Sequence, residues 1–134
     1  MNEDEKKLIS QLLSEGECCS AVIVSLGLKL KKEENAQFVS SARALCLGMR
    51  SGMLCGALTG SVCALGLFAP DNTEMIQAMT DWFKDNYGGE DGTCSCISLT
   101  KGDAFIRRTA CPVIVNDSFD RVKKLLQDYG YIEN

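Results

Sequence analysis

Eight cysteines are the residues of this chain best suited to chemistry, and they stand at positions 18, 19, 46, 55, 63, 94, 96 and 111 of 134. The chain contains no histidine. This absence excludes Cys/His zinc fingers, histidine-ligated haem, and hydrolases built on a Ser-His or Cys-His pair. No two cysteines stand three residues apart, so the Cys-x-x-Cys motif of thioredoxins and zinc ribbons is also missing. The chemistry that remains depends on thiolates or carboxylates.

Cys111 stands at the predicted start of the last helix and is the best candidate for a reactive thiolate. Apolar residues at i, i+4, i+7, i+11 and i+14 indicate this helix: Val115, Phe119, Val122, Leu126 and Tyr129. Pro112 fits the first helical position, which makes Cys111 the N-cap. There the helix dipole and free N–H groups lower a thiol pKa, and Arg107 and Arg108 add positive charge if they fold back. The competing interpretation is that Cys111 only fills the core.

Cys55, Cys94 and Cys96 are the next candidates. Cys55 opens a glycine-rich helix, so it too is expected at a helix N-terminus with free backbone amides. Cys94 and Cys96 stand in a glycine-rich stretch, residues 88–102, which has no helical periodicity and is expected to be an exposed loop. Two thiols in such a loop can form a redox pair or bind one metal ion.

The remaining cysteines are weaker candidates. Cys18 and Cys19 are adjacent on a predicted helix, where neighbouring side chains diverge by about 100°, so at most one is expected to face a given site. Cys46 and Cys63 lie among apolar residues, and we expect them to pack in the core.

The elements that must position these cysteines are predicted to be helices. Apolar periodicity, capping residues and terminating glycines indicate helices over residues 2–16, 18–30, 38–49, 54–68, 70–88 and 112–129, although Gly16 could either break or bend the first pair. The length and the hydrophobic content of 46% suit one domain. We therefore predict a single compact all-α domain over residues 1–134, with about five or six helices, a glycine-rich central helix and a cysteine-containing loop.

The helix predicted over 54–68 is unusual because Gly56 and Gly60 stand four residues apart and leave one side nearly bare. Another helix can approach such a side closely. The surrounding segment 51–70 carries no charge and is about as long as a membrane span, but glycines dilute its hydrophobicity and it lacks flanking Trp or Tyr belts. We predict a buried helix in a protein that does not insert into membranes.

Charge and the N-terminal sequence narrow the partners and the compartment. The formal net charge of −4, from 14 basic and 18 acidic residues, argues against a nucleic-acid partner. The chain starts with polar and acidic residues, unlike the basic and then apolar start of a secretory signal. We therefore predict a cytoplasmic protein. In a reducing cytoplasm the cysteines are not expected to form structural disulfides.

The most specific motif is Cys-Gly-Ala-x-x-Gly at residues 55–60, preceded by a glycine-rich approach at 48–52. With it the chain resembles the putative redox-active proteins designated C_GCAxxG_C_C, a family with four characteristic cysteines. The resemblance covers most of the chain and matches those cysteines to Cys18, with adjacent Cys19 as the alternative, and to Cys55, Cys96 and Cys111. It implies a redox role without a settled substrate. Part of the pattern also resembles the non-haem portion of split-Soret cytochromes, which implies an iron–sulfur cluster as an alternative.

We therefore expect Cys18, Cys55, Cys96 and Cys111 to converge in one thiol-rich site. The first hypothesis is thiol–disulfide or electron-transfer chemistry with an unknown redox partner. In it Cys111 or Cys55 attacks and a neighbour such as Cys96 resolves; an enzyme of this kind would be a thiol-dependent oxidoreductase. The second hypothesis is a binding module in which the same four cysteines hold zinc or an iron–sulfur cluster. The third is a helical interaction or dimerisation protein with incidental cysteines, and a homodimer fits all three.

Overall fold

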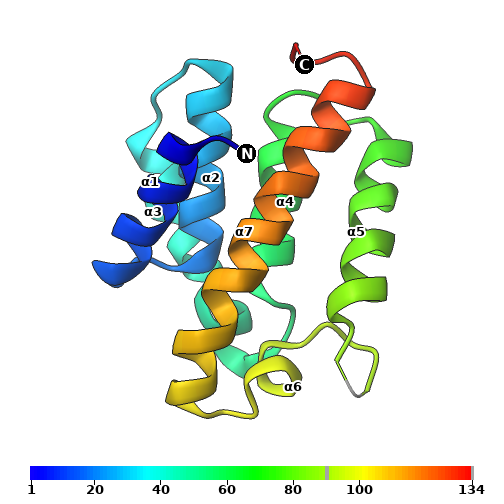
Figure 1. The fold of residues 1–134 in the computed structure, drawn as a ribbon. Helices are drawn as coiled ribbons and strands as arrows, with labels where there is room; N and C mark the ends of the chain where they lie inside the picture. The colour runs from blue at the N-terminus through cyan, green and yellow to red at the C-terminus, as the bar shows by residue number, and fades with distance from the viewer. Residues whose placement is uncertain (90, 134) are drawn as a thin grey trace.

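A computed structural model describes residues 1–89 and 91–133, and within them seven α-helices and no β-strand are found (Figure 1). Six of the helices are substantial and α6 is short. They pack as a single all-α domain, which confirms the predicted fold class.

The first two helices begin and end where local interactions dictate. α1 (Glu3–Ser14) starts with a capping box, in which the Asn2 and Glu5 side chains accept from each other's backbone N–H groups. Gly16, with a φ of +88°, then breaks the helical path before α2 (Cys19–Lys31) begins. Gly16 therefore separates two helices rather than bending one.

The centre of the domain is the crossing of α2 with α4 (Gly56–Gly66) (Figure 1). A Cβ atom on Gly60 would lie 2.7 Å from the Ser20 Cα atom and 2.8 Å from the Ser20 carbonyl oxygen. Further along the crossing, a Cβ atom on Gly27 would lie 2.9 Å from that of Ala64. The small residues thus bring the two helices almost backbone to backbone, which confirms the close approach predicted for α4.

α1, α5 (Thr73–Tyr87) and α7 (Ala104–Asp128) surround this crossing. The largest fully buried side chains come from all five helices and include Ile9, Ile23, Leu65, Phe83, Phe119 and Leu126. Figure 1 shows that α2, α4 and α7 all begin at the same end of the bundle. The residues that open these helices therefore meet at that end.

The uncharged segment 51–70 forms α4 and the turns beside it, and α4 lies largely in the core. Among residues 1–89 and 91–133, no helix combines the length and the apolar character that crossing a membrane requires. The buried helix predicted for this segment is confirmed.

The helix predicted over 38–49 is much shorter than expected. α3 (Ala36–Ala42) ends early, and a 3₁₀ turn (Arg43–Leu45) and an irregular turn (Gly48–Gly52) replace the rest. Leu47, Met49 and Arg50 adopt left-handed backbone conformations, with φ between 55° and 58°. These conformations cannot continue a right-handed helix, so the chain turns here before it leads into α4.

The last helix starts earlier than predicted, so the N-cap position assigned to Cys111 is wrong. The Asp103 side chain accepts hydrogen bonds from the N–H groups of Phe105 and Ile106, so α7 begins at Ala104 and contains Pro112 in its interior. The proline removes one helical hydrogen bond without ending the helix.

Two smaller corrections concern the region around α5. The helix predicted to start at residue 70 starts at Thr73, because the side chain of Asn72 caps it by accepting from the N–H of Met75. The stretch 88–102 is not a wholly irregular exposed loop, because Ser95 caps the short α6 (Cys96–Thr100) and both Cys94 and Ser95 are buried.

Replacement of Gly60 tests the crossing of α2 and α4. Gly60→Ala should lower the free energy of unfolding by about 1–3 kcal/mol, because the new Cβ atom meets backbone that cannot yield cheaply. Gly66→Ala is the matched control: no atom lies within 4 Å of its added Cβ. The control should raise stability by up to about 1 kcal/mol through helix propensity. Urea unfolding measures both, and equal stability of the two variants would contradict the close crossing.

Candidate functional site

A cavity of about 720 Å³ lies where α2 and α4 begin and the first turns of α7 pass them. Six of the eight cysteines line it: Cys18, Cys19, Cys46, Cys55, Cys96 and Cys111. The structure therefore brings all four cysteines named from the sequence to one cavity, together with Cys19 and Cys46. Cys63 and Cys94 do not line it.

A short backbone pairing brings Cys55 and Cys96 together. Leu54 and Ser95 form an isolated antiparallel bridge. The Cys55 N–H donates to the Cys94 carbonyl oxygen at 2.9 Å, and the Cys96 N–H donates to the Met53 carbonyl oxygen at 2.5 Å. The cysteine-containing loop is thus fastened to the residues that lead into α4.

Cys55 is the N-cap residue of α4, as predicted, but it is not a low-pKa thiol. Burial raises its pKa to about 11, and the hydrogen bonds from the N–H groups of Ala57 and Leu58, which favour the thiolate, are too weak to offset this. The helix N-terminus therefore does not activate Cys55, because removal from water outweighs the amides.

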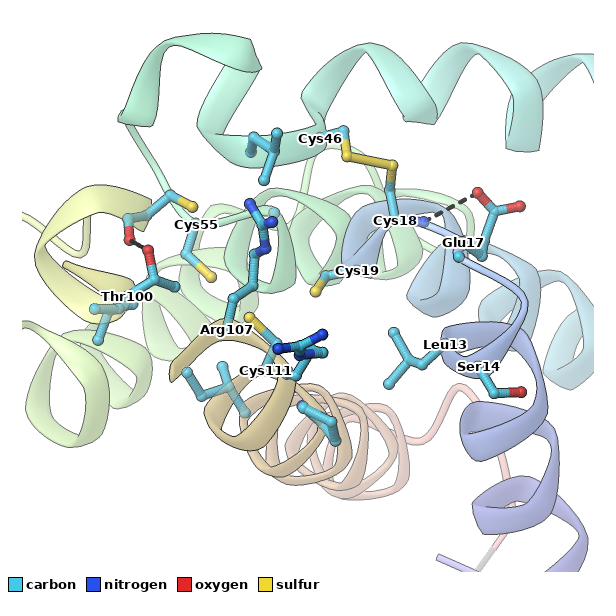
Figure 2. Close-up of a pocket in the computed structure, with 18 of the residues that line it drawn as sticks. Leu13, Ser14, Glu17, Cys18, Cys19, Cys46, Cys55, Thr100, Arg107 and Cys111 are labelled. Carbon is cyan, nitrogen blue, oxygen red and sulfur yellow. Dashed lines mark hydrogen bonds between the residues drawn. A yellow bond between two sulfur atoms is a disulfide. The ribbon is translucent and has the colours of Figure 1, made fainter. Parts of the chain in front are cut away.

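Cys111 has a lowered pKa for reasons other than those its sequence position suggested. It lies inside α7, and its sulfur accepts from the Cys19 thiol, which is the main influence lowering its pKa. Partial burial opposes this effect, and the positive charge of Arg107, one turn earlier, assists it, as predicted for that arginine. Figure 2 shows Cys19, Cys55 and Cys111 turned towards a common space, with Arg107 beside them.

The pKa of Cys19 shifts in the opposite direction to that of Cys111. Its pKa is raised well above the usual range, first by donating to Cys111 and then by burial and the nearby charge of Cys111. The Cys96 pKa is also raised, mainly by burial. The cavity thus contains one thiol whose pKa is lowered, Cys111, among thiols whose pKa is raised: Cys19, Cys55 and Cys96.

Cys18 and Cys46 form a disulfide at the edge of the same space, with Cα atoms 5.4 Å apart (Figure 2). The prediction that Cys46 only fills the core is therefore wrong. The Glu17 carboxylate supports this geometry by accepting from the Cys18 N–H at 3.0 Å and from Arg43 at 2.8 Å. Arg43 lowers the pKa of Glu17, so the carboxylate remains charged at neutral pH. Cys63, by contrast, is half-buried and packs against a second apolar cluster, as expected.

The prediction that Cys18 and Cys19 could not both face the site is also wrong. The expected divergence applies to two residues inside a helix, but Cys18 is the N-cap of α2 and has extended backbone dihedrals, φ −74° and ψ 147°. Cys19 therefore lines the cavity together with Cys18. Its sequence contained a usable indication, because Gly16 ends the preceding helix and Cys19 opens the next at a spacing of Gly-x-x-Cys.

The ligand set proposed for zinc or an iron–sulfur cluster does not fit this arrangement. Cys18 is bonded to Cys46, so its sulfur is not available as a thiolate. In the part of the chain that the structure describes, no three cysteine, aspartate or glutamate side chains are placed to hold one metal ion. With Cys18 in a disulfide, the four cysteines therefore do not form one four-thiolate ligand set in this arrangement.

Residues 17–125 match the family model described as "Putative redox-active protein (C_GCAxxG_C_C)". The chain belongs to this family. The matched range contains every cysteine of the cavity, and the family's redox character agrees with the gathering of thiols there. No curated protein and no solved structure matches the chain.

The opposite pKa shifts predict different alkylation of the fully reduced protein. Cys111 should react with iodoacetamide at a lower pH than Cys55, whose thiolate fraction at neutral pH is on the order of 10⁻⁴ for a pKa of about 11. Peptide mass spectrometry across a pH series measures, for each cysteine, the pH at which its alkylation rate reaches half of its maximum. This midpoint reports the acidity of the thiol, whereas the maximal rate reports how accessible the thiol is.

Arg107→Gln provides the control for this measurement. It should raise the Cys111 midpoint and leave that of half-buried Cys63 unchanged, since Arg107 acts on the charge of Cys111. A shared midpoint for Cys55, Cys63 and Cys111 would refute the activation of Cys111.

Proposed function

We propose that this cavity carries out thiol–disulfide exchange, with Cys111 as the attacking thiolate and Cys19 as the resolving thiol. The observation that carries the proposal is that Cys19 and Cys111 line one cavity and face each other there, and their interaction lowers the pKa of Cys111 and raises that of Cys19. A thiolate held next to a protonated thiol is the arrangement that exchange through a mixed disulfide requires. A protein of this kind is a thiol-dependent oxidoreductase.

In the first step the Cys111 thiolate attacks one sulfur of a disulfide R–S–S–R. A Cys111–S–S–R bond forms, the R–S–S–R bond breaks, and a thiolate RS⁻ departs. The departing thiolate takes the proton of Cys19, and the Cys19 thiolate then attacks the Cys111 sulfur. This releases the second RS⁻ and leaves a Cys19–Cys111 disulfide, so two electrons have moved from the protein to the substrate.

The pKa values favour this order of events. In the reduced protein, the pKa of Cys19 is raised first by its hydrogen bond to Cys111, then by burial and then by the charge on Cys111. Once Cys111 is part of a mixed disulfide it carries no charge, and the Cys19 pKa is then raised only by burial and by the weaker influences of Cys55 and Cys96. The first step therefore prepares Cys19 for the second.

The other cysteines of the cavity supply a second couple and a second resolving thiol. The Cys18–Cys46 disulfide lines the same cavity as Cys19 and Cys111, so two electrons could pass between the couples by exchange. Structural disulfides are rare in a reducing compartment such as the cytoplasm, so we assign the Cys18–Cys46 disulfide a redox role in this proposal. Cys96, which experiences the charge of Cys111, is the alternative resolving thiol, and Cys55 lines the site as a protonated thiol.

Removal of the resolving thiol tests the proposal. Reduced wild-type protein treated with neutral 4,4′-dithiodipyridine should form a Cys19–Cys111 disulfide, whereas Cys19→Ser should retain the pyridyl adduct on Cys111. Cys63→Ser is the control and should behave as wild type, since Cys63 lies outside the cavity.

Peptide mapping by mass spectrometry reads both outcomes of this experiment. A Cys96–Cys111 disulfide in Cys19→Ser would transfer the resolving role to Cys96. Absence of any adduct or disulfide at Cys111 in both proteins would overturn the proposed function.

A further inference from the structure

The charge of the cavity differs from the charge of the chain. The protein has a net charge of −4, yet among the described residues the only charged side chains lining the cavity are Glu17, Arg107 and Arg108. Glu17 is neutralised by Arg43, with which it forms an ion pair at 2.8 Å. Within residues 1–89 and 91–133, no carboxylate forms an ion pair with Arg107 or Arg108. The thiol cavity therefore presents two uncompensated guanidinium groups.

Both arginines stand beside the reactive sulfur. Arg107 is four residues and Arg108 three residues before Cys111, and these are the spacings at which side chains of one helix are neighbours. Both line the cavity, and Arg107 is close enough to lower the pKa of Cys111 and to affect Cys96. A carboxylate bound by these guanidiniums would be held within reach of the Cys111 sulfur.

The remaining lining suits a small, flexible molecule. Leu13, Leu47, Leu99 and Pro112 supply apolar contacts, and the volume of about 720 Å³ lies in the range of small-molecule sites. The cavity therefore combines a place for a carbon chain, cations for its acidic end and a thiolate for its sulfur.

We propose that the substrate of the cavity is a low-molecular-weight disulfide that carries carboxylates, recognised by Arg107 and Arg108. The proposal rests on the exchange function argued above and names its substrate class. The carboxylated disulfide is the oxidant, accepting two electrons to become two carboxylated thiols while the Cys19–Cys111 disulfide forms. The guanidiniums favour binding of the anion and stabilise the negative charge that develops on the departing thiolate.

Three disulfides that differ in charge test this selectivity: dianionic 3,3′-dithiodipropionate, neutral 2-hydroxyethyl disulfide and dicationic cystamine. Rate constants for oxidation of Cys111 are measured at low ionic strength and divided by those for free dithiothreitol, which removes differences in the intrinsic reactivity of the probes. The normalised rate constant should be about tenfold higher for the anion than for the neutral probe, and lowest for the cation. The preference should shrink as salt is added.

Substitutions of Arg108 assign the effect to the cavity. Arg108→Gln should reduce the ratio of the anion rate constant to the neutral rate constant several-fold, and Arg108→Glu should reverse the preference. Lys29→Gln is the control: it removes one positive charge, as Arg108→Gln does, but near the far end of α2. It should leave the ratio unchanged. The ratio cancels any change in the thiolate itself, because the same sulfur attacks every probe. Thermal melting verifies that each variant is folded.

The outcomes distinguish the two proposals. Equal normalised rates for all three probes, or a preference for cystamine, would overturn the substrate class and leave the exchange function standing. A preference that persists in Arg108→Glu at low salt would overturn the role of that arginine. Failure of Cys111 to react with any probe would overturn both.

Discussion

Ser20 is the residue on which the geometry of the thiol cavity depends. Its backbone lies against Gly60, where an added Cβ atom would come within 2.7 Å, and its buried hydroxyl donates to the Ala42 carbonyl oxygen at 2.8 Å. The first contact fixes the register of α2 and α4, so Cys19 and Cys55 open neighbouring helices. The second holds the end of α3, from which the following turn brings Cys46 to Cys18. One residue thus places four sulfur atoms around a common space.

Thiols of one chemical type are given different acidities by their surroundings. Cys55 occupies the helix N-terminus, which is usually taken as the activating position, yet burial raises its pKa to about 11. Cys111 lies inside a helix, away from any free amide, and its pKa is lowered by Cys19 and Arg107. At Cys111 the hydrogen bond from Cys19 and the charge of Arg107 outweigh the effect of burial on the pKa. At Cys55 the two backbone N–H groups do not outweigh it. This difference is what allows one thiol to attack while its neighbours remain protonated.

The redox character of the family gains a physical basis from the composition of the cavity. Cys46 stands outside the four-cysteine pattern of the motif, and Cys19 enters it only as the alternative to Cys18, yet both line the same space as the other cysteines of the pattern. An oxidised couple, Cys18–Cys46, and a polarised thiol pair, Cys19 and Cys111, therefore share one solvent pocket. Two arginines give that pocket a positive charge in an acidic protein, so the electrostatics of the site follow from its local residues and not from the net charge.

The sequence by itself determined the features that depend on short-range chemistry. The capping box at Asn2, the apolar periodicity of the helices and the small residues at Gly56 and Gly60 predicted the helical class and the close crossing, because each is encoded within a few consecutive residues. Only the tertiary structure decided which sulfur atoms meet. The left-handed turn that leads from Cys46 towards α4 uses residues with no intrinsic preference for it, Leu47, Met49 and Arg50, and Pro112 is compatible with both a helix start and a helix interior. Burial and contacts between helices, such as that of Cys19 with Cys111, set the thiol pKa values, and residue spacing along the chain specifies only the contribution of Arg107, one turn before Cys111.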